Sequence, residues 1–196
     1  LATGVFRMSR RNALVKRLQA VEALGQATVI ALDKTGTITK NEMVIRNVFV
    51  NGRMFDIGGS GYDPKGEISL GREVIDPLNH NELIFAGKLA ALCANARVFF
   101  VEDGGYWRVA GDPTEAAMLV FAEKIGFKKF ELEKEAPLIA EIPFDHKNKY
   151  HATSHRVDHK ELVVISGVPE KILKLSNREY SLENPPIGQT SKFLQI

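Results

Sequence analysis

The sequence predicts an α+β fold, in which a short helix-and-strand start of the α/β kind precedes a larger domain made of an antiparallel sheet flanked by helices. Three observations support this class. An apolar run at 27–32 ends at Asp33 and a polar turn, as a strand buried on both faces does. Asn51-Gly52 separates two β-prone runs, which is a strong hairpin signal. Helix-length apolar segments then alternate with further β-prone runs.

Length and composition bound the class of protein. The chain has 196 residues, enough for one good core or two small ones. Hydrophobic content of 44%, charged content of 26% and a net charge of +2 are ordinary for a globular protein and give no reason to expect a nucleic-acid partner. No apolar run reaches the roughly 18–20 residues that cross a bilayer. The single cysteine, Cys93, excludes an internal disulfide, suits a reducing compartment and is expected to be a buried structural thiol.

The first segment reads as one helix followed by one strand. Residues 6–24 repeat apolar side chains at helical spacing with basic residues off that stripe, which predicts a helix covering a sheet or, alternatively, a membrane-surface helix. The apolar run 27–32 then places Asp33 at a strand's carboxyl end, where open α/β sheets carry their chemistry. A carboxylate held there suits a nucleophile, whereas the simpler interpretation is a turn residue before Gly36.

The pattern changes near residue 40 from an α/β start to an antiparallel meander. Strands are expected at Val44–Val50 and Arg53–Ile57, with a hinge at 40–44. This change predicts two domains, 1–40 and 41–196, of which the first lacks the other strands of a parallel sheet.

The glycine-rich segment Gly58–Gly61 lacks the ending of a phosphate-binding loop and is interpreted as a surface loop. A helix is expected at Asn81–Ala96, with Asn79 or Asn81 as its N-cap. A hairpin with strands at 98–101 and 106–109 follows.

A second long helix is expected to begin at Asp112 and Pro113, because Asp is a good N-cap and Pro suits the first turn. Further strands are expected at 138–144, 149–157 and 161–166, a helix at 169–176, a linker at Asn184–Pro186 and the start of a helix at 191–196.

The segment Asp33–Thr39, which reads DKTGTIT, resembles the phosphorylation signature of the P-type cation-transporting ATPases. The resemblance implies that residues 1–40 begin a haloacid-dehalogenase-like phosphorylation domain. It implies that Asp33 attacks the γ-phosphate of ATP and forms an aspartyl-phosphate. It also implies Mg²⁺ ligands in Asp33 and the backbone carbonyl of Thr35, with Lys34 offsetting phosphoryl charge. Thr35 replaces the acid/base Asp of related phosphatases, which should prolong the phosphoenzyme.

The segment Gly111–Ala116, which reads GDPTEA, resembles a motif of the calcium-pump-like subgroup. The resemblance implies that Glu115 meets the amino group of adenine, with Thr114 nearby, because a carboxylate accepts from an exocyclic amine. The simpler interpretation is an acidic helix N-terminus, and both can hold.

Residues 142–149 resemble the family's Pro-Phe-x-x-x-x-Lys segment. The resemblance implies that Phe144 stacks on adenine and that Lys149 approaches the base or the phosphates, although Phe144 could instead be a core residue. His146 stands where the family often has Arg, which would make that phosphate contact weaker and pH-dependent.

Residues 164–170 align with the family's Lys-Gly-Ala-Pro-Glu motif, and Ser166 replaces its lysine beside Gly167. Ser166 cannot supply a cation. Three explanations are open: Lys149 compensates for the missing charge, nucleotide binding is weak, or the site is tuned to another control. Three histidines four residues apart would share one face of a helix and could suggest a metal site: His151, His155 and His159. This segment reads as strand and turn, in which such neighbours lie too far apart to bind one ion.

We therefore expect a cytoplasmic piece of an ATP-driven cation pump of calcium-pump-like type, with ATP and Mg²⁺ as cofactors. Its partners would be ATP and the remainder of the pump, including membrane helices on whose cytoplasmic face it would lie. Residues 41–196 would be most of the nucleotide-binding domain, and domain closure would bring ATP to Asp33. The alternatives are a nucleotide-binding module without turnover and a soluble phosphatase of the same superfamily.

Overall fold

A computed structural model describes residues 2–17 and 19–178. The chain forms two compact units, Leu1–Asn41 and Glu42–Ile196, and each is described here by itself. The described residues combine helices with antiparallel sheets, which confirms the α+β class. Every helix in this part of the chain is too short or too polar to span a bilayer.

The first unit contains two short helices, α1 (Ala2–Ser9) and α2 (Gln19–Gly25), in place of the single predicted helix at 6–24. The prediction of one continuous helix is wrong because the chain turns after Ser9, where Asn12 takes a left-handed φ of 61°. Neither helix buries a residue. Helices this short gain most of their stability from packing an apolar face, and none is packed here.

The predicted strand at 27–32 is also wrong, because these residues form no strand. Val29, Ile30 and Leu32 are 82%, 74% and 60% exposed, so the run is not buried on either face. A parallel strand exists only through its neighbours, and the described residues of this unit provide no strand to pair with it. The haloacid-dehalogenase-like character of residues 1–40 therefore stays a prediction, since the described residues of this unit contain no strand.

The second unit begins with a four-stranded antiparallel sheet in the order β1-β2-β3-β4. The predicted hairpin at Asn51-Gly52 is confirmed, since both residues have positive φ angles, 49° and 72°, as a type I′ turn needs. Sequence analysis missed the second hairpin of this sheet. The strands are β1 (Asn47–Val50), β2 (Arg53–Ile57), β3 (Ile68–Leu70) and β4 (Glu73–Ile75).

Two long helices form the centre of this unit, α3 (Asn81–Cys93) and α4 (Pro113–Ile125). The predicted cap of α4 is confirmed, because the Asp112 carboxylate accepts the backbone N–H groups of Thr114 and Glu115. The predicted cap of α3 at Asn79 or Asn81 is wrong. His80 occupies that position and makes no capping bond with its side chain, while Asn79 ends a 3-10 turn, η1 (Pro77–Asn79).

The remaining elements form two further antiparallel sheets, so among the described residues the predicted single sheet is three separate sheets. The sequence did not predict α5. The elements are β5 (Arg97–Val101), η2 (Glu102–Gly104), β6 (Tyr106–Ala110), α5 (Lys129–Glu135), β7 (Leu138–Ile142), β8 (Tyr150–Val157), β9 (Lys160–Gly167) and α6 (Pro169–Leu175). The linker and helix expected at 184–196 lie outside the described residues.

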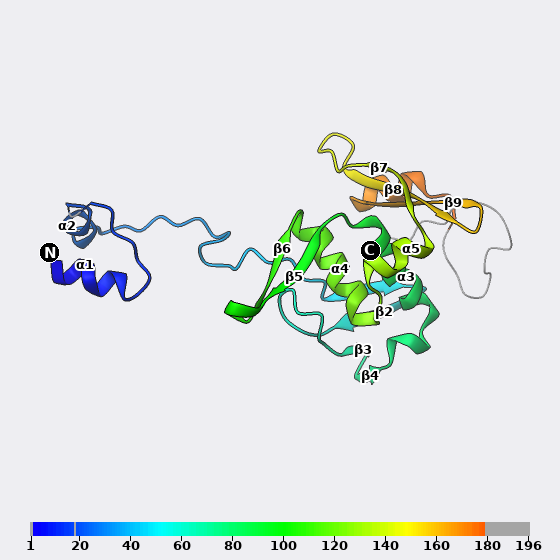
Figure 1. Cartoon of the computed structure of the whole chain (residues 1–196), viewed down its shortest axis with the longest axis horizontal. Helices are drawn as coiled ribbons and strands as arrows, with labels where there is room; N and C mark the ends of the chain where they lie inside the picture. Colours follow the sequence, from blue (N-terminus) through cyan, green and yellow to red (C-terminus); the bar gives the residue numbers. More distant parts are fainter. Residues whose placement is uncertain (1, 18, 179–196) are drawn as a thin grey trace. The chain divides into compact units, whose positions relative to one another are not determined.

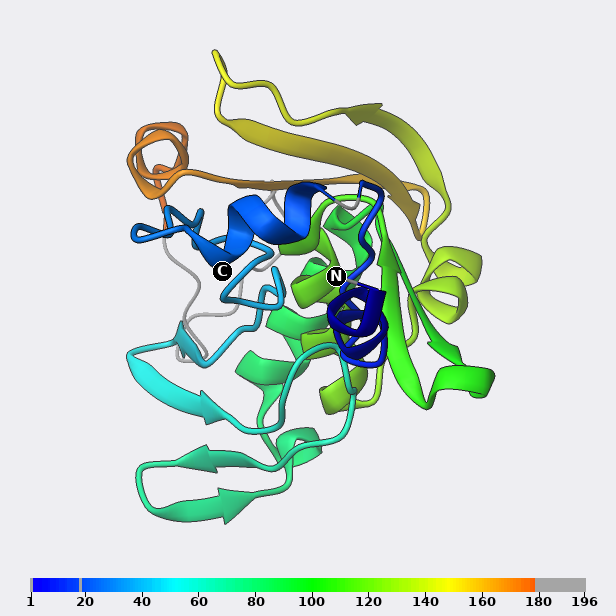
Figure 2. The same ribbon diagram turned by 90° about the vertical axis from the view of Figure 1, so that its left-hand side faces the viewer.

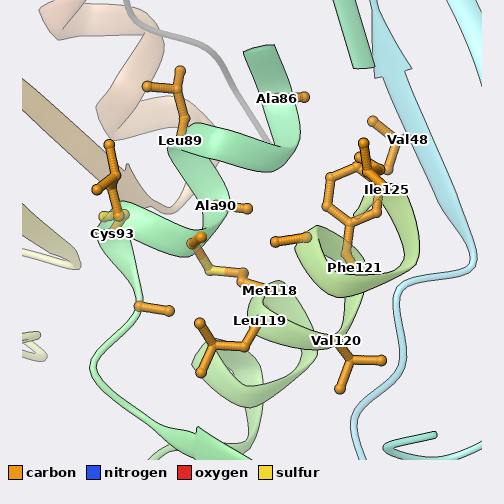
Figure 3. Close-up of a cluster of buried hydrophobic side chains, with 14 of the residues drawn as sticks. Val48, Ala86, Leu89, Ala90, Cys93, Met118, Leu119, Val120, Phe121 and Ile125 are labelled. Carbon is orange, nitrogen blue, oxygen red and sulfur yellow. The ribbon is translucent and has the colours of Figure 1, made fainter. Parts of the chain in front are cut away.

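The helix pair α3–α4 lies between the sheet β1–β4 and the sheet β7–β9, and two views at right angles agree on this layering (Figures 1 and 2). Both helices bury residues around most of their circumference, as expected for helices with partners on several sides. Side chains of α3, α4 and β1 meet in one core, in which Phe121 is 1% exposed (Figure 3). Cys93 is buried, as predicted.

Candidate functional site

A cavity of about 460 Å³ opens in the second unit beside the N-terminus of α4. This volume lies in the range of small-molecule sites. Its walls come from segments far apart in the sequence: the chain before β1, the start of α4, the loop after β7, and the paired strands β8 and β9. The predicted site residues that line it are Thr114, Glu115, Phe144, Ser166 and Gly167.

Glu115 lies in the first turn of α4, and its carboxylate is held by contacts from outside that helix. Its Oε2 accepts the backbone N–H of Asn95 at 2.8 Å, and its Oε1 lies 3.3 Å from Nδ1 of His151. A carboxylate near a helix N-terminus is also favoured by the helix dipole. Each carboxylate oxygen has two lone pairs, so Glu115 keeps acceptor capacity for a ligand in the cavity.

Phe144 presents a half-exposed ring to the cavity, with 50% of its surface accessible. This exposure contradicts the alternative that Phe144 is a core residue. The loop after it is closed by Asp145, whose Oδ1 accepts the N–H groups of Lys147 and Asn148. His146 packs edge-on against Phe144, with ring centroids 5.5 Å apart. His146 therefore contacts the predicted stacking residue without lining the cavity itself.

Lys149 does not line the cavity, but its backbone shapes one wall. Its carbonyl accepts the N–H of Val168 at 3.0 Å, which closes the β8–β9 edge next to Gly167. A Cβ at Gly167 would lie 2.5 Å from the Lys149 carbonyl oxygen and 2.7 Å from Cβ of Tyr150. Only glycine fits this approach of the two strands, so Gly167 has a structural reason to be there.

Ser166 lines the cavity directly opposite His151 in the β8–β9 ladder. The thiol of Cys93 lies behind it and donates to Ser166 Oγ at 3.4 Å. This wall therefore carries a hydroxyl and a thiol where the family resemblance places a lysine.

Sequence analysis missed His151 as a residue of this site. Its Nδ1 lies 3.3 Å from Glu115 and its Nε2 lies 3.1 Å from Oε1 of Glu141. Asn95 joins the same cluster, since its side-chain amide donates to Glu141 while its backbone bonds Glu115. The pKa of His151 is raised, chiefly by the hydrogen bond to Cys93. Electrostatic interactions with Cys93 and Glu115 and the hydrogen bond to Glu141 raise it further, while burial acts in the opposite direction.

The histidine series does not converge on one ion. His155 is fully buried, with Nδ1 at 3.0 Å from the Ala136 carbonyl and Nε2 at 3.1 Å from the Leu92 carbonyl. His159 lies in the exposed turn after β8. Across the part of the chain that the structure describes, no group of three or more His, Cys, Asp or Glu side chains could hold a metal ion.

The other predicted residues lie in the first unit. Asp33, Lys34 and Thr35 are exposed at the start of a turn, which is closed by bonds from the N–H groups of Ile38 and Thr39 to the Lys34 carbonyl. Asp33 is thus accessible to a ligand rather than sealed in apolar packing.

The glycine segment Gly58–Gly61 does not line the cavity beside α4. Its backbone carbonyls accept from side chains of the protein itself, Gly58 from Lys124 at 2.5 Å and Gly59 from Arg46 at 2.8 Å. The exposure of this segment and these bonds support the interpretation as a surface loop.

Comparison with known proteins identifies relatives of the whole chain. The profile of the family described as P-type ATPase, cytoplasmic domain N, matches residues 82–186, just over half of the chain. The chain is 39% identical over 179 residues to a probable cation-transporting ATPase F of Mycobacterium tuberculosis, covering 91% of this chain and 20% of that protein. It is 40% identical over 182 residues to the cation-transporting ATPase pma1 of Synechocystis, covering 89% and 19%.

A calcium-transporting ATPase of Bacillus subtilis is 36% identical over 181 residues, covering 92% of this chain and 20% of the relative. The chain thus spans about a fifth of the length of these relatives. On the family match and these identities, the chain belongs to the P-type cation-transporting ATPases, of which it contains a segment with cytoplasmic domain N.

Proposed function

We propose that the second unit binds ATP through its adenosine part in the cavity beside α4, and that Asp33 accepts the γ-phosphoryl group in the full-length pump. The observation that carries the binding proposal is the convergence of Glu115, Phe144 and Ser166 on one cavity of about 460 Å³. These residues come from α4, from the loop after β7 and from β9. Family membership supports ATP as the ligand.

The side chains around the cavity would contact different parts of ATP. The half-exposed face of Phe144 stacks on the adenine ring, and Glu115 accepts a hydrogen bond from the exocyclic amine. Thr114, Ser166 and Gly167 enclose the base from the α4 and β9 sides. His146 and Lys149 lie outside the cavity lining and approach the phosphate chain, which extends away from the base.

The chemical step uses the turn at Asp33. A carboxylate oxygen of Asp33 forms a bond to the γ-phosphorus as the bond from that phosphorus to the β–γ bridging oxygen breaks, which leaves ADP and an aspartyl-phosphate. Lys34 offsets charge on the phosphoryl oxygens. Thr35 has no carboxyl group with which to activate a hydrolytic water, so the phosphoenzyme persists.

Mg²⁺ fits the exposed turn as part of a site shared with phosphate. The Asp33 carboxylate and the Thr35 backbone carbonyl are hard oxygen ligands, and Mg²⁺ is commonly held by one or two carboxylates together with substrate phosphates. When bound, the ion supplies charge neutralisation for the transferred group.

The setting we propose is a membrane pump. Residues 1–40 would belong to its phosphorylation domain and residues 41–196 to its nucleotide-binding domain, on the cytoplasmic face, joined to membrane helices in the rest of the protein. Domain closure would bring ATP to Asp33. The names of the relatives, cation- and calcium-transporting ATPases, support a cation as cargo.

The binding proposal is tested by calorimetric titration of the chain with ATP. We expect saturable binding that Phe144→Ala weakens by about tenfold or more, since base–aromatic stacking contributes ~1–3 kcal/mol. Phe130→Ala, which removes an exposed ring of α5 outside the cavity, is the matched control and should leave binding unchanged. Equal affinities for all three proteins would contradict the proposal.

The second candidate function is a nucleotide-binding module without turnover, which the exposed and unpaired run before Asp33 favours for this chain alone. Incubation with γ-labelled ATP separates the candidates. Labelling of the chain that is lost in Asp33→Asn supports transfer, whereas ATP binding without labelling supports the module. Release of phosphate from small phosphate esters would instead support the phosphatase alternative.

A further inference from the structure

The cavity contains a charge arrangement that ATP binding alone does not explain. Among the described residues that line it, His151 is the one that can become positive, whereas Asp112 and Glu115 are acidic. His151 is buried in β8, so its charge is not dispersed by solvent. Its protonation state therefore changes the net charge of this lining by a full unit beside the bound ligand.

The geometry around His151 favours the charged imidazole. Nδ1 faces the Glu115 carboxylate at 3.3 Å and Nε2 faces the Glu141 carboxylate at 3.1 Å. The Nε2 contact is a hydrogen bond and the Nδ1 contact is an ion-pair distance, so a positive ring between the two carboxylates is stabilised by both of them. Both carboxylates are partly shielded from solvent, with side chains 17% and 25% exposed, so a positive charge between them is favourable.

The groups around the ring come from every element packed against it. Cys93 of α3 lies 4.0 Å from Nδ1, Glu115 belongs to α4, Glu141 belongs to β7, and uncharged Ser166 stands opposite in β9. These neighbours raise the pKa of His151, the hydrogen bond to Cys93 most of all, so the ring loses its proton at a higher pH than an unperturbed histidine.

Asn95 links the two carboxylates that flank His151. Its backbone N–H holds Oε2 of Glu115 at 2.8 Å, and its side-chain amide holds Oε1 of Glu141 at 3.1 Å. On the cavity side, charged His151 is the ion-pair partner of Oε1 of Glu115, 3.3 Å from Nδ1. Loss of that proton removes one of the contacts that orient the Glu115 carboxylate and leaves two acidic groups without their counter-charge.

We propose that His151 is a positioning residue whose charged form orients Glu115 and offsets the negative charge of the cavity, so that nucleotide affinity falls as this imidazole loses its proton. The inference rests on the proposed ATP site and adds a proton-linked control to it. It also supplies a physical answer to the missing cation at Ser166, because the positive charge comes from the cross-strand neighbour.

The test compares ATP affinity from pH 6 to pH 9 for the chain and His151→Gln. The phosphate groups of ATP titrate equally in both experiments, so the ratio of the two affinities isolates His151. We expect that ratio to fall roughly three- to tenfold as pH rises, since one pH unit of linkage corresponds to a tenfold change. His159→Asn, which removes an exposed imidazole from the turn after β8, should keep the profile of the unchanged chain.

A ratio that is constant with pH, with ATP bound by both proteins, would overturn the inference and leave the proposed function intact. Absence of ATP binding by the unchanged chain at every pH would overturn the proposed function and this inference with it.

A second measurement needs no variant of His151. Linkage is reciprocal, so saturating ATP should raise the NMR titration midpoint of the His151 ring by about half to one pH unit. Glu141→Gln removes one carboxylate partner and should lower that midpoint without ATP. A midpoint that ATP leaves unmoved would overturn the inference even where His151→Gln fails to fold.

Discussion

The two units of this chain differ in how their apolar residues are used. In the second unit, the apolar residues of α3 and α4 are packed between sheets and form one core (Figure 3). In the first unit, the apolar residues at 29, 30 and 32 remain exposed, and neither α1 nor α2 buries a residue. A strongly apolar run is therefore not enough to make a strand, since the run needs partners that this segment does not bring with it.

The same difference separates the two candidate sites. The cavity beside α4 is formed by tertiary packing within one unit, and its residues are held by bonds between distant segments. The turn at Asp33 is closed only by local bonds to the Lys34 carbonyl. We therefore expect ligand binding in the second unit to be preorganised, and chemistry at Asp33 to depend on the remainder of the pump.

The largest effect should come from the core of the second unit. Phe121→Ala should lower the free energy of unfolding by about 3–5 kcal/mol, because the ring is fully buried between the helices. Ile30→Ala in the first unit should change it by less than ~0.5 kcal/mol. Urea unfolding of both variants measures the contrast, and a cost at Ile30 equal to that at Phe121 would break the comparison.

His155→Leu should be the next most damaging change. It leaves the Ala136 carbonyl without its ring partner, at about 1–3 kcal/mol, whereas the Leu92 carbonyl keeps the Thr153 hydroxyl as a donor. His159→Asn, in the exposed turn, should change the free energy of unfolding by less than ~0.5 kcal/mol. Chemical denaturation of the pair provides the measurement, and a His155→Leu protein as stable as the control would refute this role.

Asp112→Ala should cost about 1 kcal/mol through loss of the N-cap of α4. Asp103→Ala removes an equal charge from an exposed turn and should be close to neutral. Thermal unfolding compares the two variants. Equal stabilities would show that the capping bonds to Thr114 and Glu115 do not stabilise the helix.

The smallest effect is a pH dependence of stability. The pKa of His151 is raised in the folded protein, so its contribution is fully present below the pKa of an unfolded histidine, about 6.5, and is lost as pH rises through the folded pKa. The stability difference between the chain and His151→Gln should therefore shrink as pH rises through the folded pKa. A difference that grows with pH in denaturation experiments would have the wrong sign for this cluster.

The sequence predicted several local features of the second unit. The turn at Asn51-Gly52, the cap at Asp112 and the hairpin of β5 and β6 all depend on neighbouring residues, and all are confirmed. Two failures were local, since the cap of α3 falls at His80 and the helix predicted at 6–24 is interrupted by the turn at Asn12. Other failures depend on distant residues. The run at 27–32 lacked strand partners, and His151 became part of the site only through the register that sets it opposite Ser166.

The residues of the candidate site could be predicted only in part. Glu115 and Phe144 were predicted from motif resemblance, and the structure brings them to one cavity. Glu141 and Asn95 carry no sequence signal, because their relation to Glu115 arises only when β7 and the end of α3 pack together.

The most direct test of the account is residue-resolved NMR of the chain during titration with ATP. We predict that the shifted resonances cluster at Thr114, Glu115, Phe144, Ser166 and Gly167, which line the cavity of the second unit. The basic segment Arg7–Arg11 of the first unit should remain unperturbed. Shifts concentrated in that segment, or no saturable shifts at millimolar ATP, would contradict the account.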